Sequence, residues 1–539
     1  FNVGQAGFYC IGAYTAAILS TRFGWSIWIL LPVSGIMTAV CSLVLSVPTA
    51  KLKGMYFTIV TLGFSEIVRQ LCLNWTSLTR GPRGISGIAT PSFFGLDIPR
   101  STFFYYLLIV LTAIMLLCTN RVLRSRVGRA WRSIREDEAA AASLGVQVAH
   151  YKKINLAYSA FWAGVAGCVY AFFQRFISPD TFTLDESFNI LAMNIIGGQG
   201  TLLGPIVGAL VINLITELFR SALQYRMLLY SVLIIAMMWL RPQGLVGTVN
   251  RKVPSESGEA EKQLAAEEKE ESMAALLEVQ HISKHFGGLK ATDDISMQVE
   301  QGEILGIIGP NGAGKTTFFN LITGTYRLTS GKIMFDGKDV TNYTPEKMAK
   351  LGIGRTFQNI KLFKFLSVLE NVKVGFHIQT STGITDSILH TKRYRNDEAL
   401  ANEKGMEILR RVGLADQAAL LAGNLPYGWQ RRLEIARAMA LAPKILLLDE
   451  PAAGMNPSET AELMAFIHTL RDDGITVVVI EHDMKFMMNL CDRIVVINYG
   501  KKLAEGTPAE VTRNEQVIEA YLGTGLTIDS RRAGGHTNE

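Results

Sequence analysis

The chain has 539 residues, more than a single hydrophobic core usually serves, so we expect at least two domains. Its 49% apolar content and mean hydropathy of +0.22 are high for a soluble enzyme and argue against a purely water-soluble protein. The formal net charge of +6 hides an asymmetry, because the residues before position 251 hold 19 Lys and Arg against nine Asp and Glu.

Apolar residues concentrate before residue 245 and predict an α-helical, polytopic membrane domain at 1–250 with about eight crossings. The candidate spans cover residues 7–19, 27–47, 55–72, 103–118, 154–173, 188–219 and 227–240. Because the chain opens with Phe1 inside an apolar, Gly-rich run, we expect a leading segment of one or two spans to precede it. The six cysteines are scattered, and we interpret them as small apolar side chains in a reducing compartment.

Positive charge predicts the orientation of these spans. Eight of the 19 basic residues fall in one loop: Arg121, Arg124, Arg126, Arg129, Arg132, Arg135, Lys152 and Lys153. The positive-inside rule places this basic loop in the cytoplasm. Lys51 and Lys53 agree with that orientation, whereas Arg80, Arg83 and Arg100 would lie outside. A nucleic-acid patch is the competing interpretation of the arginine cluster, and the flanking spans argue against it.

Two features of the spans are candidates for a pathway across the membrane. Glu66 and Arg69 stand at i and i+3 in one span, where opposite charges can meet, and ionisable residues in spans generally face the bundle interior. The alternative is that Arg69 snorkels to the outer interface and leaves Glu66 partly hydrated. Gly197 and Gly198 interrupt the run 188–219, which is too long for one span, and interrupted helices often line a cavity. An ordinary turn between two helices is the alternative there.

The region that follows the spans predicts a change of domain. Within the basic loop, residues 133–145 are Ala-rich and predict a short helix that stops at Gly145. Residues 255–272 are acidic, rich in Ala, Glu and Lys and nearly free of large apolar side chains, so they cannot build a core. We therefore expect a charged linker at 251–272, a second domain at 273–525 and a polar tail at 526–539.

The second domain contains a complete phosphate-binding loop. The loop consists of Gly309, Pro310, Asn311, Gly312, Ala313, Gly314, Lys315, Thr316 and Thr317. It follows the strand-like run 303–308 and precedes the helix-like run 318–322, which is the context that the G-x-x-x-x-G-K-[ST] pattern requires. Its backbone N–H groups and the helix N-terminus would hold phosphates. Lys315 would reach the β- and γ-phosphates of a nucleotide, and the Thr316 hydroxyl would bind Mg²⁺.

Further polar residues follow the predicted strands of this domain. The apolar run 445–448 ends in Asp449, which suits a Mg²⁺ shell, and Glu450, which suits the base that orients an attacking water. His482 follows the strand-like run 476–480, at the edge where open α/β sheets bind ligands. Gln358 lies beyond another strand-like run. Taken singly, a loop glutamine is usually just solvated and a histidine after a strand is usually structural.

Together these residues resemble the nucleotide-binding domain of an ATP-binding-cassette (ABC) transporter, over residues 276–523. The resemblance implies an α/β P-loop domain with a helical subdomain that binds ATP and Mg²⁺. It further implies that Gln358 contacts Mg²⁺ and the transmembrane partner, that His482 touches the γ-phosphate, and that Phe286 stacks on adenine. A loop similar to the family's D-loop is expected at 453–456, with Asn456 where Asp is usual.

The family signature, which acts on the ATP of an opposing subunit, falls at Leu425, Pro426, Tyr427, Gly428, Trp429 and Gln430. Pro426 and Tyr427 replace the usual Ser and first Gly, and Trp429 replaces the usual Gln. The missing Ser hydroxyl removes one ligand to the γ-phosphate of the opposing ATP. Gly428 and the following helix can still present backbone N–H groups to phosphate.

The first domain resembles the permease of branched-chain amino-acid ABC importers. The resemblance rests on the runs 6–9, 12–14 and 196–200, and the Pro-Tyr-Gly signature and the run 451–457 point to the same subfamily. It implies that a coupling helix, which docks on the ATPase, is formed by Glu138, Ala139, Ala140 and Gly145. Because the ATPase must be cytoplasmic, an even number of crossings must separate Lys153 from Arg241. The run 188–219 therefore makes two short crossings and turns at its Gly-rich segment.

We expect a permease–ATPase fusion that imports hydrophobic, branched-chain amino acids across the cytoplasmic (inner) membrane, with its ATPase domain in the cytoplasm. Import of urea, short amides or another small solute is an alternative. A non-transport ABC ATPase is the alternative from another class, and the spans argue against it. The resemblance implies a second permease subunit, a second ABC ATPase subunit and a periplasmic or lipid-anchored solute-binding protein as partners, with membrane lipid around the spans and no nucleic acid.

Overall fold

The structure is a computed structural model of the chain and describes residues 2–49, 52, 54–89, 99–218, 226–241, 244–246 and 275–522. The predicted linker at 251–272, the predicted tail at 526–539, and Lys51 and Lys53 lie outside these residues. The chain divides into two compact units: Phe1–Arg124 with Ala149–Arg251, and Ser125–Val148 with Lys252–Glu539. Most of the basic loop therefore groups with the C-terminal half, although it lies in the N-terminal half of the sequence.

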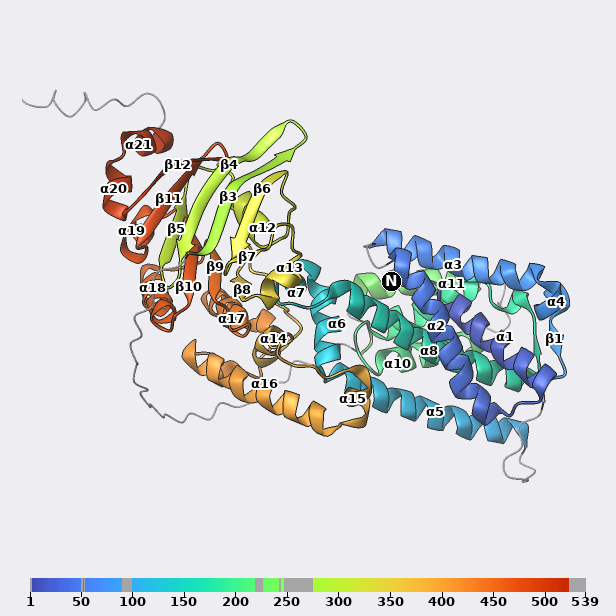
Figure 1. Cartoon of the computed structure of the whole chain (residues 1–539). Coiled ribbons are helices and arrows are strands. Elements are labelled where there is room, and N and C mark those ends of the chain that lie inside the picture. The colour runs from blue at the N-terminus through green and yellow to red at the C-terminus, as the bar shows by residue number, and fades with distance from the viewer. Residues whose placement is uncertain are drawn as a thin grey trace, which may run out of the picture. The chain divides into compact units, whose positions relative to one another are not determined.

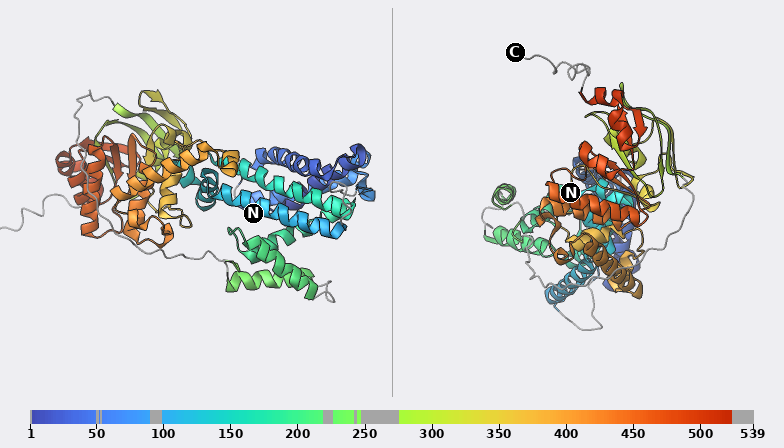
Figure 2. Two further views of the ribbon diagram at one scale, coloured as in Figure 1. Left: turned by 90° about the horizontal axis from the view of Figure 1, so that it is seen from below. Right: turned by 90° about the vertical axis from the view of Figure 1, so that its left-hand side faces the viewer.

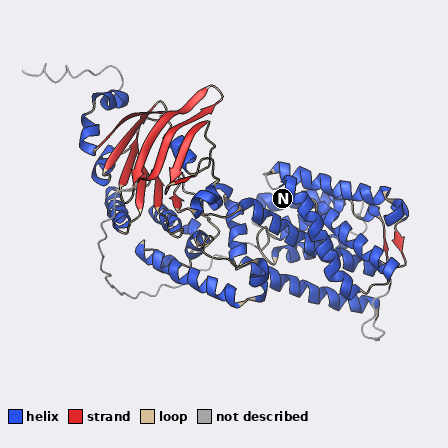
Figure 3. Ribbon diagram, viewed as in Figure 1, coloured by secondary structure: helices blue, strands red, loops and turns tan. Residues whose placement is uncertain are grey.

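The first unit is built from helices (Figure 1; Figure 3). They are α1 (Gln5–Phe23), α2 (Ile27–Thr49), α3 (Met55–Asn74), α4 (Thr76–Thr79), η1 (Gly81–Arg83), α5 (Arg100–Leu123), α8 (Val148–Gln174), η2 (Pro179–Thr181), α9 (Leu184–Gly197), α10 (Gly204–Leu218) and α11 (Arg226–Leu240). Two short strands, β1 (Ile85–Ser86) and β2 (Phe176–Ile177), pair antiparallel. Among the residues that the structure describes, α2, α5 and α8 are long and apolar enough to cross a membrane, and α10 is a shorter apolar helix.

The long apolar run 188–219 is broken, as the sequence predicts, because α9 ends at Gly197 and α10 begins at Gly204. Glycine permits the close approach of these two helices, since a Cβ on Gly197 would lie 1.7 Å from the Gly204 carbonyl oxygen. Elsewhere in the unit, α1 packs beside α2 and α3 (Figure 2). A Cβ on Gly12 of α1 would lie 2.3 Å from the carbonyl oxygen of Gly164 in α8. Small residues thus set the helix contacts of this unit.

Within residues 275–522, the strands form two sheets. The six-stranded sheet has the order β12-β11-β5-β10-β9-β8, with β12 antiparallel at one edge and the other strands parallel. The four-stranded sheet is antiparallel, in the order β4-β3-β6-β7. The strands are β3 (Ala275–Phe286), β4 (Leu289–Glu300), β5 (Ile304–Ile308), β6 (Ser330–Phe335), β7 (Lys338–Asp339), β8 (Ile353–Arg355), β9 (Ile445–Asp449), β10 (Thr476–Ile480), β11 (Arg493–Asn498) and β12 (Lys501–Gly506).

The six-stranded sheet carries a hydrophobic core on each face. Side chains alternate along every strand. In β10, for example, Val477 and Val479 join a core with helices of the C-terminal part, whereas Val478 and Ile480 join a core with the four-stranded sheet. Burial on both faces explains why the central strands are continuous apolar runs in the sequence.

Arg121 belongs to α5, and Lys152 and Lys153 belong to α8. The middle of the basic loop forms two helices, α6 (Arg126–Glu136) and α7 (Glu138–Ser143), where the sequence predicts one over 133–145. The prediction is wrong in this detail because Asp137 is extended and its side chain accepts a hydrogen bond from the Ala140 N–H (2.7 Å), which starts a new helix. Gly145, with φ +78°, follows the end of α7 as the sequence predicts. We call Ser125–Val148 the coupling segment.

Some of the remaining helices of the second unit lie against its sheets, and others pack on one another below the sheets in the view (Figure 1). They are α12 (Lys315–Ile322), α13 (Pro345–Lys350), α14 (Val368–Gly375), α15 (Ile384–Leu389), α16 (Lys392–Arg411), α17 (Tyr427–Met439), α18 (Pro457–Asp472), α19 (Met484–Leu490), α20 (Pro508–Arg513) and α21 (Glu515–Leu522), with the short turns η4 (Ala415–Gln417) and η5 (Ala422–Asn424).

Candidate active site

The phosphate-binding loop connects β5 to α12, as its sequence context predicts. Gly309, Gly312 and Gly314 have φ values of +157°, +81° and +102°, which side chains with a Cβ rarely adopt. Space is also lacking, because a Cβ on Gly309 would lie 2.0 Å from the Ile497 carbonyl oxygen. The glycines therefore allow the backbone to curl over the N-terminus of α12, where N–H groups favour an anion.

Lys315 starts α12 and is nearly buried, with 6% of its surface exposed. Its Nζ donates to the carbonyl oxygens of Gly309 (2.6 Å) and Pro310 (2.9 Å). Burial lowers the pKa of the Lys315 ammonium, while the charges of Glu450 and Asp449 oppose that shift. The loop thus holds a cation close to the place where its N–H groups would receive phosphate.

Asp449 ends β9 and is almost completely buried. Its Oδ2 accepts a bond from Arg355 Nη2 (3.4 Å), and Arg355 is itself held by Asn320 and Thr323. Burial raises the pKa of the Asp449 carboxyl, and the Arg355 charge acts in the opposite direction. Among the described residues, Asp449 Oδ1 has no hydrogen-bond partner. A buried carboxylate oxygen without a donor is suited to a ligand outside the protein.

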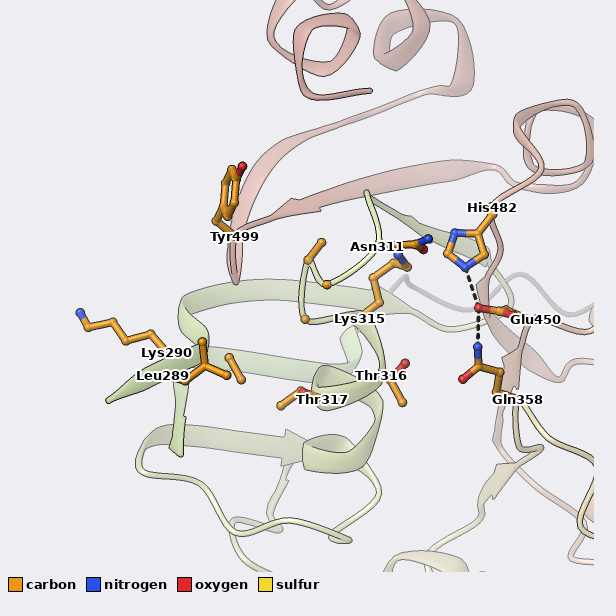
Figure 4. A pocket seen from close by; sticks show the side chains of 14 residues that line it. Leu289, Lys290, Asn311, Lys315, Thr316, Thr317, Gln358, Glu450, His482 and Tyr499 are labelled. Atoms are coloured by element: carbon orange, nitrogen blue, oxygen red, sulfur yellow. Dashed lines mark hydrogen bonds and ion pairs between the residues drawn. The ribbon is translucent and has the colours of Figure 1, made fainter. Parts of the chain in front are cut away.

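Glu450, Gln358 and His482 converge at one carboxylate oxygen (Figure 4). Gln358 Nε2 donates to Glu450 Oε1 over 3.0 Å, and His482 Nε2 lies 2.6 Å from the same atom. The three side chains come from the loop after β8, the end of β9 and the loop after β10, so the parallel strand order brings them together. Glu450 has a φ of +49°, an unusual conformation for a residue with a side chain.

A cavity of about 690 Å³ lies over the phosphate-binding loop (Figure 4). Its lining consists of Leu289, Lys290, Ala291, Asn311, Gly312, Ala313, Gly314, Lys315, Thr316, Thr317, Gln358, Glu450, His482 and Tyr499. Gly309, Pro310 and Asp449 are not among the lining residues. The sequence did not point to Leu289, Lys290, Ala291 or Tyr499. The first three begin β4, just after Phe286, and Tyr499 lies in the turn between β11 and β12.

Phe286 is at the end of β3 and does not line the cavity. Its ring packs edge-on against Tyr326, with 5.4 Å between the ring centroids, and Lys284 Nζ lies 5.1 Å from its ring centroid. The ring remains 44% exposed. The described arrangement therefore brings Leu289 and Tyr499, rather than Phe286, to the cavity.

The signature residues lie at the start of α17 and do not line the cavity of their own chain. Pro426 is the extended residue before the helix, and Gln430 Nε2 closes the turn by donating to the Leu425 carbonyl (2.7 Å). Gly428 is close to another helix, because a Cβ there would lie 3.0 Å from Glu459 Oε1. In the 453–456 loop, Asn456 caps α18 by accepting a bond from the Glu459 N–H (2.9 Å).

The coupling segment is bonded to the helices around α14 and α16. The bonds join Arg126 Nη2 to the His377 carbonyl (2.8 Å), Arg129 Nη2 to Glu398 Oε1 (2.7 Å), Arg132 Nη2 to Glu370 Oε1 (2.7 Å), the Phe365 N–H to Glu136 Oε1 (3.2 Å), and Lys361 Nζ to Asp137 Oδ2 (2.9 Å). At Gly145, a Cβ would lie 2.4 Å from the Ile378 side chain. Two arginines of the predicted basic loop, Arg129 and Arg132, thus bind carboxylates of the C-terminal half.

In the first unit, Glu66 and Arg69 form the ion pair that their spacing predicts. Arg69 Nη2 lies 2.7 Å and Nε 3.0 Å from the two carboxylate oxygens. Asp180 lies 3.8 Å from Arg69 Nη1, and Gln70 also bonds to Glu66.

Gly197 is buried against α10, and its carbonyl oxygen accepts the Val246 N–H (2.9 Å).

Comparison with known proteins matches both halves of the chain to transport proteins. The family model for the permease component of branched-chain amino-acid transport systems matches residues 1–240, that for ABC transporters matches 292–453, and that for the branched-chain amino-acid ATP-binding cassette transporter matches 501–527. The ATP-binding protein BraF of Pseudomonas aeruginosa is 47% identical over 249 residues, which cover 46% of this chain and 98% of BraF. The permease protein LivM of Salmonella typhimurium is 39% identical over 281 residues, 48% of this chain and 66% of LivM.

A solved structure of a nucleotide-free ATP-binding cassette from an ABC transporter is 33% identical, with a TM-score of 0.42, over 47% of this chain and all of that one. BraF and LivM both carry names of high-affinity branched-chain amino-acid transport proteins. The chain therefore belongs to the branched-chain amino-acid ABC transporters, and it joins a permease and a transport ATPase in one polypeptide.

Proposed function

We propose that this fusion imports branched-chain amino acids across the cytoplasmic membrane, driven by ATP hydrolysis in the cavity over the phosphate-binding loop. The observation that carries the proposal is the group of Lys315, Gln358, Glu450 and His482 around one cavity. A phosphate-binding cation, a water-orienting carboxylate and two polar side chains that hold it are the parts that phosphoryl transfer to water requires.

In this proposal Glu450 orients the attacking water. Its side chain is 15% exposed and lies at the edge of the cavity. Gln358 and His482 fix the carboxylate through Oε1, which leaves Oε2 for the water. The loop N–H groups and Lys315 bind the phosphates, whose negative charge also favours the protonated lysine.

We propose that Asp449, Thr316 and Gln358 hold Mg²⁺ beside the phosphates. The residues fit such an ion, because the buried Oδ1 of Asp449 is without a donor among the described residues. Thr316 and Gln358 line the adjoining cavity, and oxygen ligands of this kind suit a hard cation. When bound, the ion neutralises negative charge on the phosphates.

We assign transmission between the permease and the ATPase to the coupling segment, with Glu138, Ala139, Ala140 and Gly145 in its second half. The support is its set of charged bonds to the helices around α14 and α16. The Asp137–Lys361 pair lies only three residues along the chain from Gln358. A displacement of the segment would therefore reach the catalytic cavity through a short piece of backbone.

The proposal requires partner subunits in the membrane. The signature residues do not line the cavity of their own chain, and the family resemblance implies that a second ABC ATPase subunit presents its signature to this cavity. A second permease subunit and a periplasmic or lipid-anchored solute-binding protein complete the proposed importer. We place the chain in the inner membrane, with the ATPase domain in the cytoplasm.

Uptake by the assembled transporter in proteoliposomes tests the substrate and the role of ATP. We expect labelled leucine to accumulate only with ATP on the ATPase side, and unlabelled valine or isoleucine to compete with it. The matched control is the same complex with Glu450→Gln, which should bind leucine and fail to accumulate it. Accumulation of labelled urea, with no uptake of leucine, would contradict the assignment in favour of the small-solute alternative.

A further inference from the structure

Three charged side chains on one face of α17 are fully buried beside the catalytic residues. Arg431, Glu434 and Arg437 are spaced three apart, so they share one face of the helix, and each is at most 1% exposed. A row of charges in a helix is usually a solvated face. Here the row faces residues 357–361, which we call the glutamine loop because they contain Gln358.

Arg431 donates to three main-chain carbonyl oxygens around the cavity. Its Nη1 lies 2.7 Å from the Phe357 oxygen, and its Nη2 lies 3.0 Å from the Gln358 oxygen and 3.1 Å from the Glu450 oxygen. One planar guanidinium therefore joins α17 to the glutamine loop and to Glu450. Its charge is balanced by Glu434, whose Oε2 lies 3.1 Å from Nη1.

Glu434 and Arg437 hold the other groups of the same loop. Glu434 Oε1 accepts from the N–H groups of Phe357 (3.2 Å) and Lys361 (3.4 Å). Arg437 Nη1 donates to the Lys361 carbonyl (2.6 Å). The two ends of the glutamine loop are thus fixed to one helix face by charged hydrogen bonds, which are stronger than neutral ones.

Glu450 needs such support because its backbone is in the left-handed region, with φ +49°. A non-glycine residue in this region is strained and persists only where its surroundings hold it. Its N–H donates to the Ile480 carbonyl (2.8 Å) from the sheet, and its carbonyl accepts from Arg431. These two bonds clamp the peptide groups on either side of its Cα and so set the direction of its side chain.

We propose that Arg431 is a positioning residue for ATP hydrolysis, which holds Gln358 and Glu450 in the mutual geometry that orients water. The inference rests on the proposed role of Glu450 and goes beyond it by linking that role to α17. Because α17 begins at Tyr427 within the signature, a shift of the signature moves Arg431 and the Glu450 carbonyl with it. In this way α17, whose signature contacts the opposing subunit's ATP, controls the position of Glu450 in its own subunit.

Arg431→Lys in the assembled transporter tests the proposal, with Arg432→Lys as the matched control. Lysine keeps the charge, but its compact ammonium lacks the planar fork with which Arg431 reaches the three carbonyls from two nitrogens. Arg432 is the next residue on α17, is partly exposed and pairs with Glu462. We expect kcat for ATP hydrolysis to fall about 100-fold in Arg431→Lys, as for a misplaced catalytic group, with KM for ATP near the wild-type value. Arg432→Lys should keep wild-type kcat.

A double-mutant cycle separates positioning from general damage. In a Glu450→Gln background, Arg431→Lys should cause no further loss of the residual turnover, because the group that it positions is already gone. An equal loss in both backgrounds, or a wild-type kcat in Arg431→Lys, overturns the proposal. Normal turnover of Glu450→Gln alone overturns instead the proposed role of Glu450.

Glu434→Gln keeps the test decisive if Arg431→Lys does not assemble. Glutamine preserves the volume and one acceptor oxygen, but it removes the charge that balances Arg431 and Arg437. We expect a kcat loss of about tenfold with little change in KM, smaller because Arg431 still reaches the carbonyls. A wild-type kcat in this variant also contradicts the proposal.

Discussion

At the scale of single residues, the site is assembled from side chains whose roles depend on neighbours distant in the sequence. Glu450 meets Gln358 and His482, which are 92 and 32 positions away. Asp449 meets Arg355, 94 positions away, and its second oxygen faces no donor among the described residues. The geometry therefore distinguishes two adjacent carboxylates, one buried beside an arginine and one held at the cavity edge.

Glu450→Gln is the residue-scale prediction. Glutamine keeps the size of the side chain but cannot accept a proton, and general-base or water-orienting work of this kind is typically worth about 10²–10⁴-fold. We expect ATP to bind with wild-type affinity, turnover to fall by that factor, and the two ATPase domains to stay closed around ATP. ATPase rate and nucleotide retention measured on the same preparation check it, and near-normal turnover contradicts the assignment.

At the scale of secondary-structure elements, the coupling segment is held by its arginines. In the sequence these arginines indicated only that the loop is cytoplasmic. Positive-inside bias accounts for arginines in a cytoplasmic loop. The structure gives Arg129 a specific partner, Glu398 of α16, which also receives Lys373 Nζ at 2.6 Å. Arg129 and Lys373 are both nearly buried. Glu398 is thus the anion that compensates two buried cations at this junction.

Glu398→Gln should therefore destabilise the docked segment, by about 3–5 kcal/mol if it behaves as other broken buried pairs do. Burial raises the pKa of the Glu398 carboxyl, but the bonds and charges of Arg129 and Lys373 outweigh it, so the pKa is lowered overall from 4.5. A group with a lowered folded-state pKa stabilises the protein fully above its unfolded-state pKa, and this contribution is lost as the pH falls through the folded-state value.

The melting temperature of the purified complex checks this prediction at several pH values. The difference between wild type and Glu398→Gln should be full at pH 7 and should shrink as the pH falls below about 4.5, because the carboxyl of the unfolded chain becomes protonated there and that of the folded chain at a lower pH. Glu403→Gln, on an exposed position of the same helix, is the control and should leave the melting temperature unchanged. A difference that is constant with pH would show that the charge of Glu398 is not the cause.

At the scale of the whole molecule, we predict the membrane topology from the Gly-rich turn between α9 and α10. Parity requires this turn on the cytoplasmic side if both the basic loop and the ATPase are cytoplasmic. We predict that a cysteine at Thr201, in a background without the six native cysteines, reacts only with membrane-permeant reagents in intact cells. The cysteine-free parent is the control. Labelling of the Thr201→Cys variant from outside the cell by an impermeant reagent would contradict the topology.

The sequence by itself determined the local parts of this protein. The phosphate-binding loop has a fixed length and needs glycine where φ is positive, so residues 309–317, between a strand-like and a helix-like run, identify it. Strands buried on both faces, such as β9 and β10, are visible as apolar runs, and the spans are visible for the same reason. The Glu66–Arg69 pair was predictable because both residues lie on one helix.

Tertiary structure decided what depends on long-range approach. Leu289 and Tyr499 reach the cavity from different strands, and nothing in their local sequence marks them. Arg431 would be expected on a solvated face, and only the packing of α17 against the glutamine loop makes it a buried donor to three carbonyls. Periodicity in the sequence records which face of an element is apolar. A buried charge is tolerated only where other segments supply its partners. The position of such a charge is therefore known only once those segments are folded around it.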